Sequence, residues 1–180
     1  MAVLVEAISV IIRADALREK FPGGLHAFEA IVPNRTLCSD GELVRVGFMT
    51  PQDVGAFVTK LEQAGLEFVR FGKAIDLAVV DQYQGPTASC DWLEFGRVAV
   101  NDKGGKITAC LLATGQATKI HIPEGWKFEG SLSDSGHFVP NQDIDKNLEY
   151  LRSENGVDVY LDKTTGKQVY IGRTDRRNTG

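Results

Sequence analysis

The sequence lacks the features that are typical of disulfide-rich, zinc-binding and nucleotide-binding proteins. It has three cysteines, Cys38, Cys90 and Cys110, and no CxxC pair. An odd number of scattered cysteines is typical of free thiols in a reducing compartment rather than of a disulfide framework. No pair of potential ligands has the short spacing of a structural zinc site, and no glycine-rich phosphate loop is present. We therefore predict neither a metal site nor a cofactor.

Long apolar runs and basic runs are also missing. No segment approaches the roughly 20 apolar residues of a membrane span. Residues 1–5 lack the basic start of a signal peptide, and Glu6 interrupts the apolar run that follows. The net charge is −4, and Arg173, Arg176 and Arg177 lie in a polar C-terminal segment. We therefore predict a cytoplasmic protein that binds neither membranes nor nucleic acid.

The composition is that of an ordinary globular protein, with 43% hydrophobic and 24% charged residues. A chain of 180 residues can form one domain with a small appendage. We predict a main domain over residues 1–114 and an appendage over 115–172, packed on the main domain. We expect residues 173–180 to form a flexible tail and the polar segment 131–141 to be mobile as well.

The hydrophobic pattern predicts an α+β fold. Strands alternate with two helical segments in the order β-α-β-α-β-β-β-β, which favours a mixed, largely antiparallel sheet with two helices packed on one face. Pro22, Gly23 and Gly24 are expected to split the first helical segment. The predicted strands cover residues 3–12, 43–49, 66–71, 75–80, 92–100 and 107–113, and the helical segments cover 14–32 and 51–64.

The second helical segment has the clearest local signal in the chain. Thr50 suits the N-cap, and Pro51 suits the first helical position. Asp53 favours the positive end of the helix. Four apolar residues follow at helical spacing and should pack onto the sheet; they are Val54, Phe57, Val58 and Leu61.

The C-terminal part shows a weaker pattern. Ile144, Leu148 and Leu151 have the spacing of a short amphipathic helix. After it, residues 157–161 and 167–171 alternate like strands and flank a turn that contains glycine. We therefore predict a loop, a small helix and a β-hairpin in this part of the chain.

Two carboxylates, Asp76 and Glu94, stand inside apolar strand patterns. A hairpin turn over residues 101–104 places Val100 opposite Gly105, and if Val80 lies opposite Trp92, then Asp76 and Glu94 are diagonal neighbours on one face. Such a coupled pair could perform acid–base chemistry or hold a divalent metal. The alternative interpretation is that Arg97, Arg45 or backbone groups satisfy both acids near a sheet edge.

The loop between these two strands is the second candidate site. It is longer than a hairpin needs and rich in polar and aromatic groups. We predict that it binds a ligand, or else that it is an ordinary exposed loop. The candidate ligand-binding residues are Asp81, Tyr83, Cys90, Asp91 and Trp92.

The sequence shows no pairing of a nucleophile with a base, and no motif identifies a family. The three histidines are better explained by packing or by surface positions. The leading hypothesis is therefore a non-catalytic module that binds a small molecule or a protein partner. The alternative is a hydrolase or lyase that uses Asp76 and Glu94. The sequence does not predict the oligomeric state.

Overall fold

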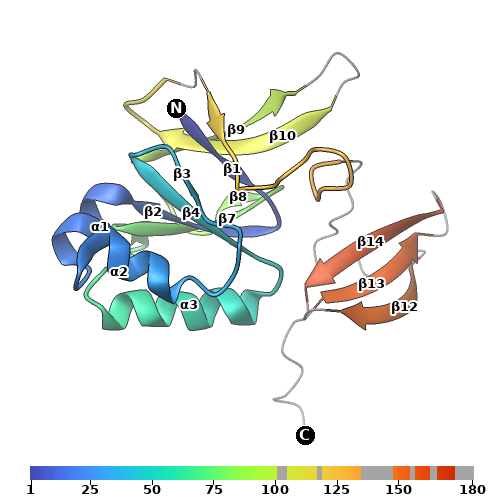
Figure 1. Cartoon of the computed structure of the whole chain (residues 1–180), viewed down its shortest axis with the longest axis horizontal. Coiled ribbons are helices and arrows are strands. Elements are labelled where there is room, and N and C mark those ends of the chain that lie inside the picture. The colour runs from blue at the N-terminus through green and yellow to red at the C-terminus, as the bar shows by residue number, and fades with distance from the viewer. Residues whose placement is uncertain (101–104, 117–118, 135–147, 155–156, 163–165, 173–180) are drawn as a thin grey trace, which may run out of the picture.

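The computed structural model describes residues 1–100, 105–116, 119–134, 148–154, 157–162 and 166–172. Helices and mostly antiparallel sheets make an α+β fold, which confirms the predicted class in its broad form. The predicted strands are divided between separate sheets and do not form the single sheet that we expected. The main body has three layers, with helices on one side of a five-stranded sheet and a four-stranded sheet on its other side (Figure 1). No helix in the described ranges is long and apolar enough to cross a membrane.

The five-stranded sheet forms the middle layer, and all its neighbouring strands are antiparallel. Because side chains alternate along a strand, each of the three long strands sends one set toward the helices and the other toward the second sheet. In sheet order the strands are β3 (Cys38–Ser39), β4 (Leu43–Phe48), β2 (Ile8–Arg13), β7 (Leu77–Asp81) and β8 (Gly85–Pro86).

Three helices cover one face of this sheet: α1 (Ala14–Lys20), α2 (Gly24–Ile31) and α3 (Pro51–Gln63). The predicted break between α1 and α2 is confirmed. Gly23 has φ +82°, and a Cβ there would lie 2.6 Å from the Ala27 Cβ. The helices bury an apolar core whose members include Val10, Ile12, Leu17, Phe28, Val44, Val46, Phe57, Leu61, Leu77 and Val79.

The predicted start of α3 is confirmed in atomic detail. The Thr50 side-chain hydroxyl accepts the backbone N–H of Asp53 at 3.1 Å, which satisfies one of the free donors at the helix start. The predicted apolar face is buried: Val54, Phe57, Val58 and Leu61.

The four-stranded sheet contains, in order, β11 (Ile120–His121), β1 (Ala2–Val5), β10 (Lys106–Leu112) and β9 (Leu93–Ala99). Only the pair β1–β11 is parallel. β11 lies beyond residue 114, where we expected the main domain to end, so part of the predicted appendage joins this sheet. The division into two domains stays a prediction. The core between the two sheets includes Val3, Val5, Ile11, Ala78, Val80, Leu93 and Cys110.

The prediction of one strand over residues 3–12 is wrong. The chain leaves one sheet after Val5 and enters the other at Ile8, and Ala7 takes φ +49° at the crossing. Gln82 stabilises this bend, because its side-chain Oε1 accepts the Ala7 N–H at 2.8 Å and its own N–H donates to the Ala7 carbonyl at 2.9 Å. Both halves are apolar and neither glycine nor proline lies between them, so Glu6 was the local signal of the break.

The prediction of a helix through Leu148 and Leu151 is also wrong. Both residues lie in β12 (Leu148–Glu154), which pairs with β13 (Val157–Asp162). The predicted hairpin is confirmed, because β13 pairs antiparallel with β14 (Lys167–Gly172). Ile144, the segment 135–141 and the tail lie outside the described residues. Of the predicted strand 66–71, only Val69–Arg70 (β5) forms, paired with Lys73–Ala74 (β6).

Candidate functional site

The predicted pairing of Asp76 with Glu94 is wrong. Val80 pairs with Ser9 and Pro86 in the five-stranded sheet, whereas Glu94 lies opposite Leu111 in the four-stranded sheet. The predicted position of Val100 opposite Gly105 is confirmed, because the Val100 N–H donates to the Gly105 carbonyl at 2.9 Å. The error therefore lies in the assumption that β7 and β9 are neighbours.

Asp76 is a structural carboxylate in this fold. It is 3% exposed, and its two oxygens accept the Lys20 ammonium at 2.8 and 2.7 Å. The backbone N–H of Glu67 donates to Oδ2 at 2.8 Å. Glu94 is exposed. No group of three His, Cys, Asp or Glu side chains in the described ranges is placed to hold a metal ion.

The structure does not bring the residues of the predicted ligand-binding loop together in one site. Asp81 Oδ1 accepts the N–H groups of Tyr83 and Gln84 at 2.8 and 2.9 Å, which folds a local turn. The Tyr83 ring lies 5.6 Å from the Arg97 guanidinium carbon, and Cys90 is half-buried against the core between the sheets.

Asp91 and Trp92 are brought together at a different place. Asp91 pairs with Lys73 at 2.6 Å, and the Trp92 indole donates to the Ala74 carbonyl at 3.1 Å. Both line a cavity of about 500 Å³, which Asp81, Tyr83 and Cys90 do not line. Its other walls include Arg13, Asp15, Arg18 and Leu112.

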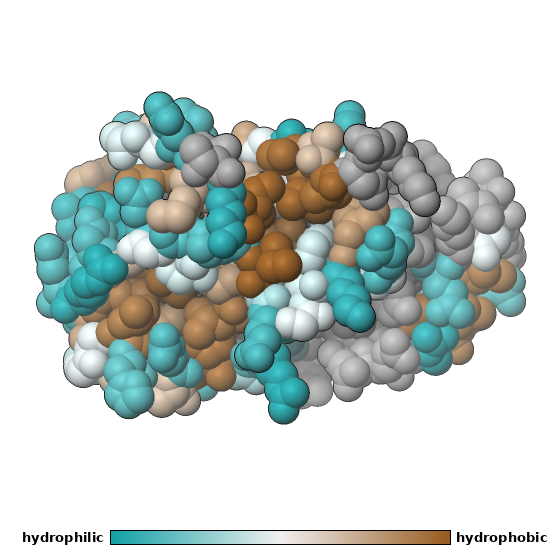
Figure 2. Space-filling view, turned by 45° about the horizontal axis from the view of Figure 1, so that its top comes forward, coloured by the Kyte–Doolittle hydropathy of each residue, from teal (hydrophilic) through white to brown (hydrophobic). Residues whose placement is uncertain are grey.

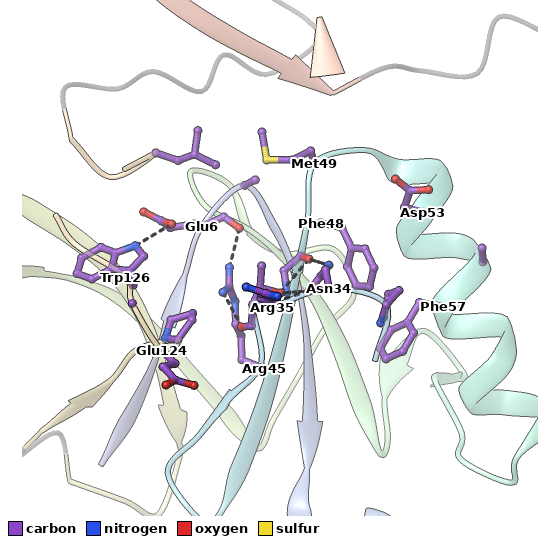
Figure 3. Close-up of a pocket in the computed structure, with 18 of the residues that line it drawn as sticks. Glu6, Asn34, Arg35, Arg45, Phe48, Met49, Asp53, Phe57, Glu124 and Trp126 are labelled. Atoms are coloured by element: carbon purple, nitrogen blue, oxygen red, sulfur yellow. Dashed lines mark hydrogen bonds between the residues drawn. The ribbon is translucent and has the colours of Figure 1, made fainter. Parts of the chain in front are cut away.

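A larger cavity of about 730 Å³ lies at the end of β4, between the loop 33–36, one face of α3 and the segment 123–132 (Figure 3). Phe48, Met49, Ala56 and Phe57 supply an apolar wall. The four lining residues of α3 follow helical spacing, so one face of that helix borders the cavity; they are Asp53, Ala56, Phe57 and Lys60.

Arg45 lies at the inner end of this cavity. It is 3% exposed, although it belongs to the apolar strand β4. Its guanidinium donates to the Ser9 hydroxyl at 3.0 Å and to the carbonyls of Thr36 at 3.1 Å and Glu6 at 3.3 Å. Gly47 makes room for it, because a Cβ at Gly47 would collide with the guanidinium.

The charge of Arg45 has no carboxylate in contact among the described residues, whose ion pairs involve other side chains. Burial lowers the pKa of its guanidinium, while Cys38 and the carboxylate of Glu6 act in the opposite direction. Three of the five guanidinium N–H groups are used in the hydrogen bonds above, so the group keeps donors to spare.

Glu6 holds the segment that closes one side of the cavity. Its Oε1 accepts the Ser133 N–H at 2.9 Å and the Ser133 hydroxyl at 2.6 Å. Its Oε2 accepts the Trp126 indole N–H at 3.0 Å, as the dashed line in Figure 3 shows. Gln82 adds a bond from its Nε2 to the Leu132 carbonyl at 3.1 Å. These bonds hold the segment against the main body, and five of its residues line the cavity: Pro123, Glu124, Gly125, Trp126 and Leu132.

Sequence reasoning missed Glu6 as a site residue, and it named Arg45 only as a partner for acids. The available signal was a single charge in an apolar run: Glu6 lies between β1 and β2, and Arg45 lies within β4. No protein-family model, curated protein or solved structure matches this chain.

Proposed function

We propose that this protein is a non-catalytic module that binds a small organic molecule in the cavity beside Arg45. The observation that carries the proposal is the cavity itself, about 730 Å³ in volume, with aromatic walls and a few polar groups. Ligand sites are typically clefts of about 300–1,000 Å³ with this mixture of surfaces.

The lining favours binding over chemistry. Neither histidine nor cysteine is among the described residues around the cavity. The Thr36 hydroxyl is already engaged, because it donates to the Asn34 side chain at 2.5 Å and accepts the Gly47 N–H at 2.7 Å. The described lining therefore offers no hydroxyl or thiol nucleophile with a free base beside it.

Cavity blocking tests the proposal. Ala56 is exposed on α3 and lines the cavity, so Ala56→Trp places an indole in the binding space without disturbing the helix core. The probes are 1-naphthaleneacetate and its neutral amide, measured by isothermal titration calorimetry. We expect the wild-type protein to bind at least one probe and Ala56→Trp to weaken that binding about tenfold or more.

Gln63→Trp is the matched control, because Gln63 is exposed on the same helix and does not line the cavity. It should bind like the wild type. The proposal fails if the wild type binds neither probe at millimolar concentration. It also fails if Ala56→Trp and Gln63→Trp bind equally well.

A further inference from the structure

We infer that the ligand of this cavity is an organic anion, with its apolar body against Phe48 and Phe57 and its charged end near Arg35 and Arg45. This inference rests on the proposed function and names the ligand class for the same cavity. It depends on which of the charged groups around the cavity already have partners.

Three cations line the cavity: Arg35, Arg45 and Lys60. None of them belongs to an ion pair among the described residues. Arg35 and Lys60 are exposed, so they can turn toward a ligand, whereas Arg45 is fixed by its three hydrogen bonds. The cavity therefore offers one fixed and two movable positive groups.

The three acids that line the cavity differ in how far they offset the charge of these cations. The charge of Glu6 acts on Arg45, but three donors from Trp126 and Ser133 occupy the Glu6 carboxylate. Asp53 and Glu124 are exposed, and their charges are screened by solvent and salt. The buried charges of Arg45 and Glu6 are both screened much less. Hydrogen bonds already occupy both oxygens of Glu6, whereas Arg45 keeps two N–H donors, so a negative group is favoured beside Arg45.

The two arginines lie close in the structure. Thr36, the chain neighbour of Arg35, accepts a hydrogen bond from Arg45 at 3.1 Å, and both arginines line the same cavity (Figure 3). A carboxylate placed with them would relieve the repulsion between two like charges and could accept charge-assisted hydrogen bonds from both. An aromatic or medium-chain carboxylic acid matches this charge pattern and the apolar wall.

The same two probes test the inference, because 1-naphthaleneacetate and its amide differ in charge and hardly in shape. We expect the wild type to bind the acid about tenfold more tightly than the amide at low salt. Added NaCl should weaken binding of the acid and leave the amide unchanged. Arg35→Gln should remove most of the preference for the acid.

Arg18→Gln is the matched control, because Arg18 is an exposed arginine that lines the other cavity. It should keep the wild-type preference for the acid. Equal binding of acid and amide, both weakened by Ala56→Trp, would overturn the anion inference and leave the proposed function standing. Binding of neither probe, or binding that Ala56→Trp does not weaken, would overturn both.

Discussion

The indole N–H of Trp126 donates to the carboxylate of Glu6 at 3.0 Å, although 120 residues separate them in sequence. Glu6 stands where the chain crosses between the two sheets, and Trp126 belongs to the segment that closes the cavity. The same carboxylate accepts two bonds from Ser133. The buried side chain of Glu6 therefore holds the wall of the site from the point where the chain passes between the two sheets.

Glu6→Gln should loosen this wall. A carboxylate accepts at both oxygens, whereas an amide presents an NH₂ on one side, which would face either the Trp126 indole N–H or the Ser133 donors. Leaving a buried donor without an acceptor costs about 1–3 kcal/mol. We expect a loss of that size in urea denaturation and a red-shifted Trp126 emission, measured in a Trp92→Phe background.

Glu124→Gln is the control for this change, because Glu124 is an exposed acid in the same cavity wall. It should leave both the stability and the Trp126 emission unchanged. An identical response from Glu6→Gln would show that the Glu6 hydrogen bonds do not hold the segment.

Two aspartate–lysine pairs provide a matched comparison of buried and exposed charge. The Asp76 side chain is 4% exposed beside Lys20, whereas the Asp91 side chain is 71% exposed beside Lys73. Asp76→Asn removes a buried carboxylate from a pair whose Lys20 side chain is 39% exposed and also weakens the bond from the Glu67 N–H, so it should destabilise the protein by about 1–3 kcal/mol. Asp91→Asn should have no measurable effect in the same denaturation experiment. Equal effects would contradict a structural role for Asp76.

The three thiols should differ in reactivity. Burial raises the pKa of Cys38, Cys90 and Cys110, but only Cys90 is half-exposed. Because the thiolate is the reactive form, iodoacetamide should modify Cys90 first in the native protein, and its rate should keep rising as the pH passes 9. Cys38 and Cys110 should react only in urea. Mass spectrometry of the alkylated peptides would detect the reverse order, which would contradict this assignment.

The raised thiol pKa values also predict the direction of the stability change at alkaline pH. The unfolded chain releases its thiol protons near the ordinary value of 9.0, whereas the folded chain retains them, most strongly at Cys110. The unfolded state is therefore favoured as the pH rises above that value, and stability falls. Cys110→Ala should reduce this fall, and urea denaturation between pH 8 and 10 would measure it.

Local features could be predicted from sequence because their causes are local. The Thr50 cap needs only the residues up to Asp53, and the register of β9 with β10 needs only the turn between them. The assignment of strands to sheets could not be predicted. β7 and β9 are consecutive long strands of similar pattern, yet the return through β8 sends the chain from one sheet to the other.

The site itself depends on contacts between distant residues. Arg45 is visible in the sequence as a charge among Val44, Val46 and Phe48, but its acceptors come from two distant segments of the chain, Glu6 to Ser9 and the loop at Thr36. Figure 3 shows side chains from separate segments around one cavity, and Figure 2 shows apolar patches interrupted by hydrophilic residues on the face in view. Strand periodicity predicts on which face of the strand a residue lies, but it does not predict which sheet or helix packs against that face.

Gly47 and Gly55 differ in whether a side chain would fit. Gly47 lies against the Arg45 side chain, whereas Gly55 lies on the exposed face of α3. Gly47 and Gly55 both have negative φ, so neither needs glycine for its backbone conformation. A Cβ at Gly47 would collide with the Arg45 guanidinium, whereas a Cβ at Gly55, exposed on α3, meets nothing within 4 Å. The two positions should therefore respond to alanine in opposite directions.

Gly55→Ala should stabilise the protein by about 0.5–1 kcal/mol, because alanine loses less backbone entropy in a helix. Gly47→Ala should destabilise it by about 1–3 kcal/mol, since it displaces a guanidinium that holds three buried acceptors. Gly47→Ala should also weaken binding of 1-naphthaleneacetate, because Arg45 moves. Urea denaturation and calorimetry of both variants test this, and a stabilising Gly47→Ala would show that Arg45 is free to shift and is not fixed against the β4 backbone.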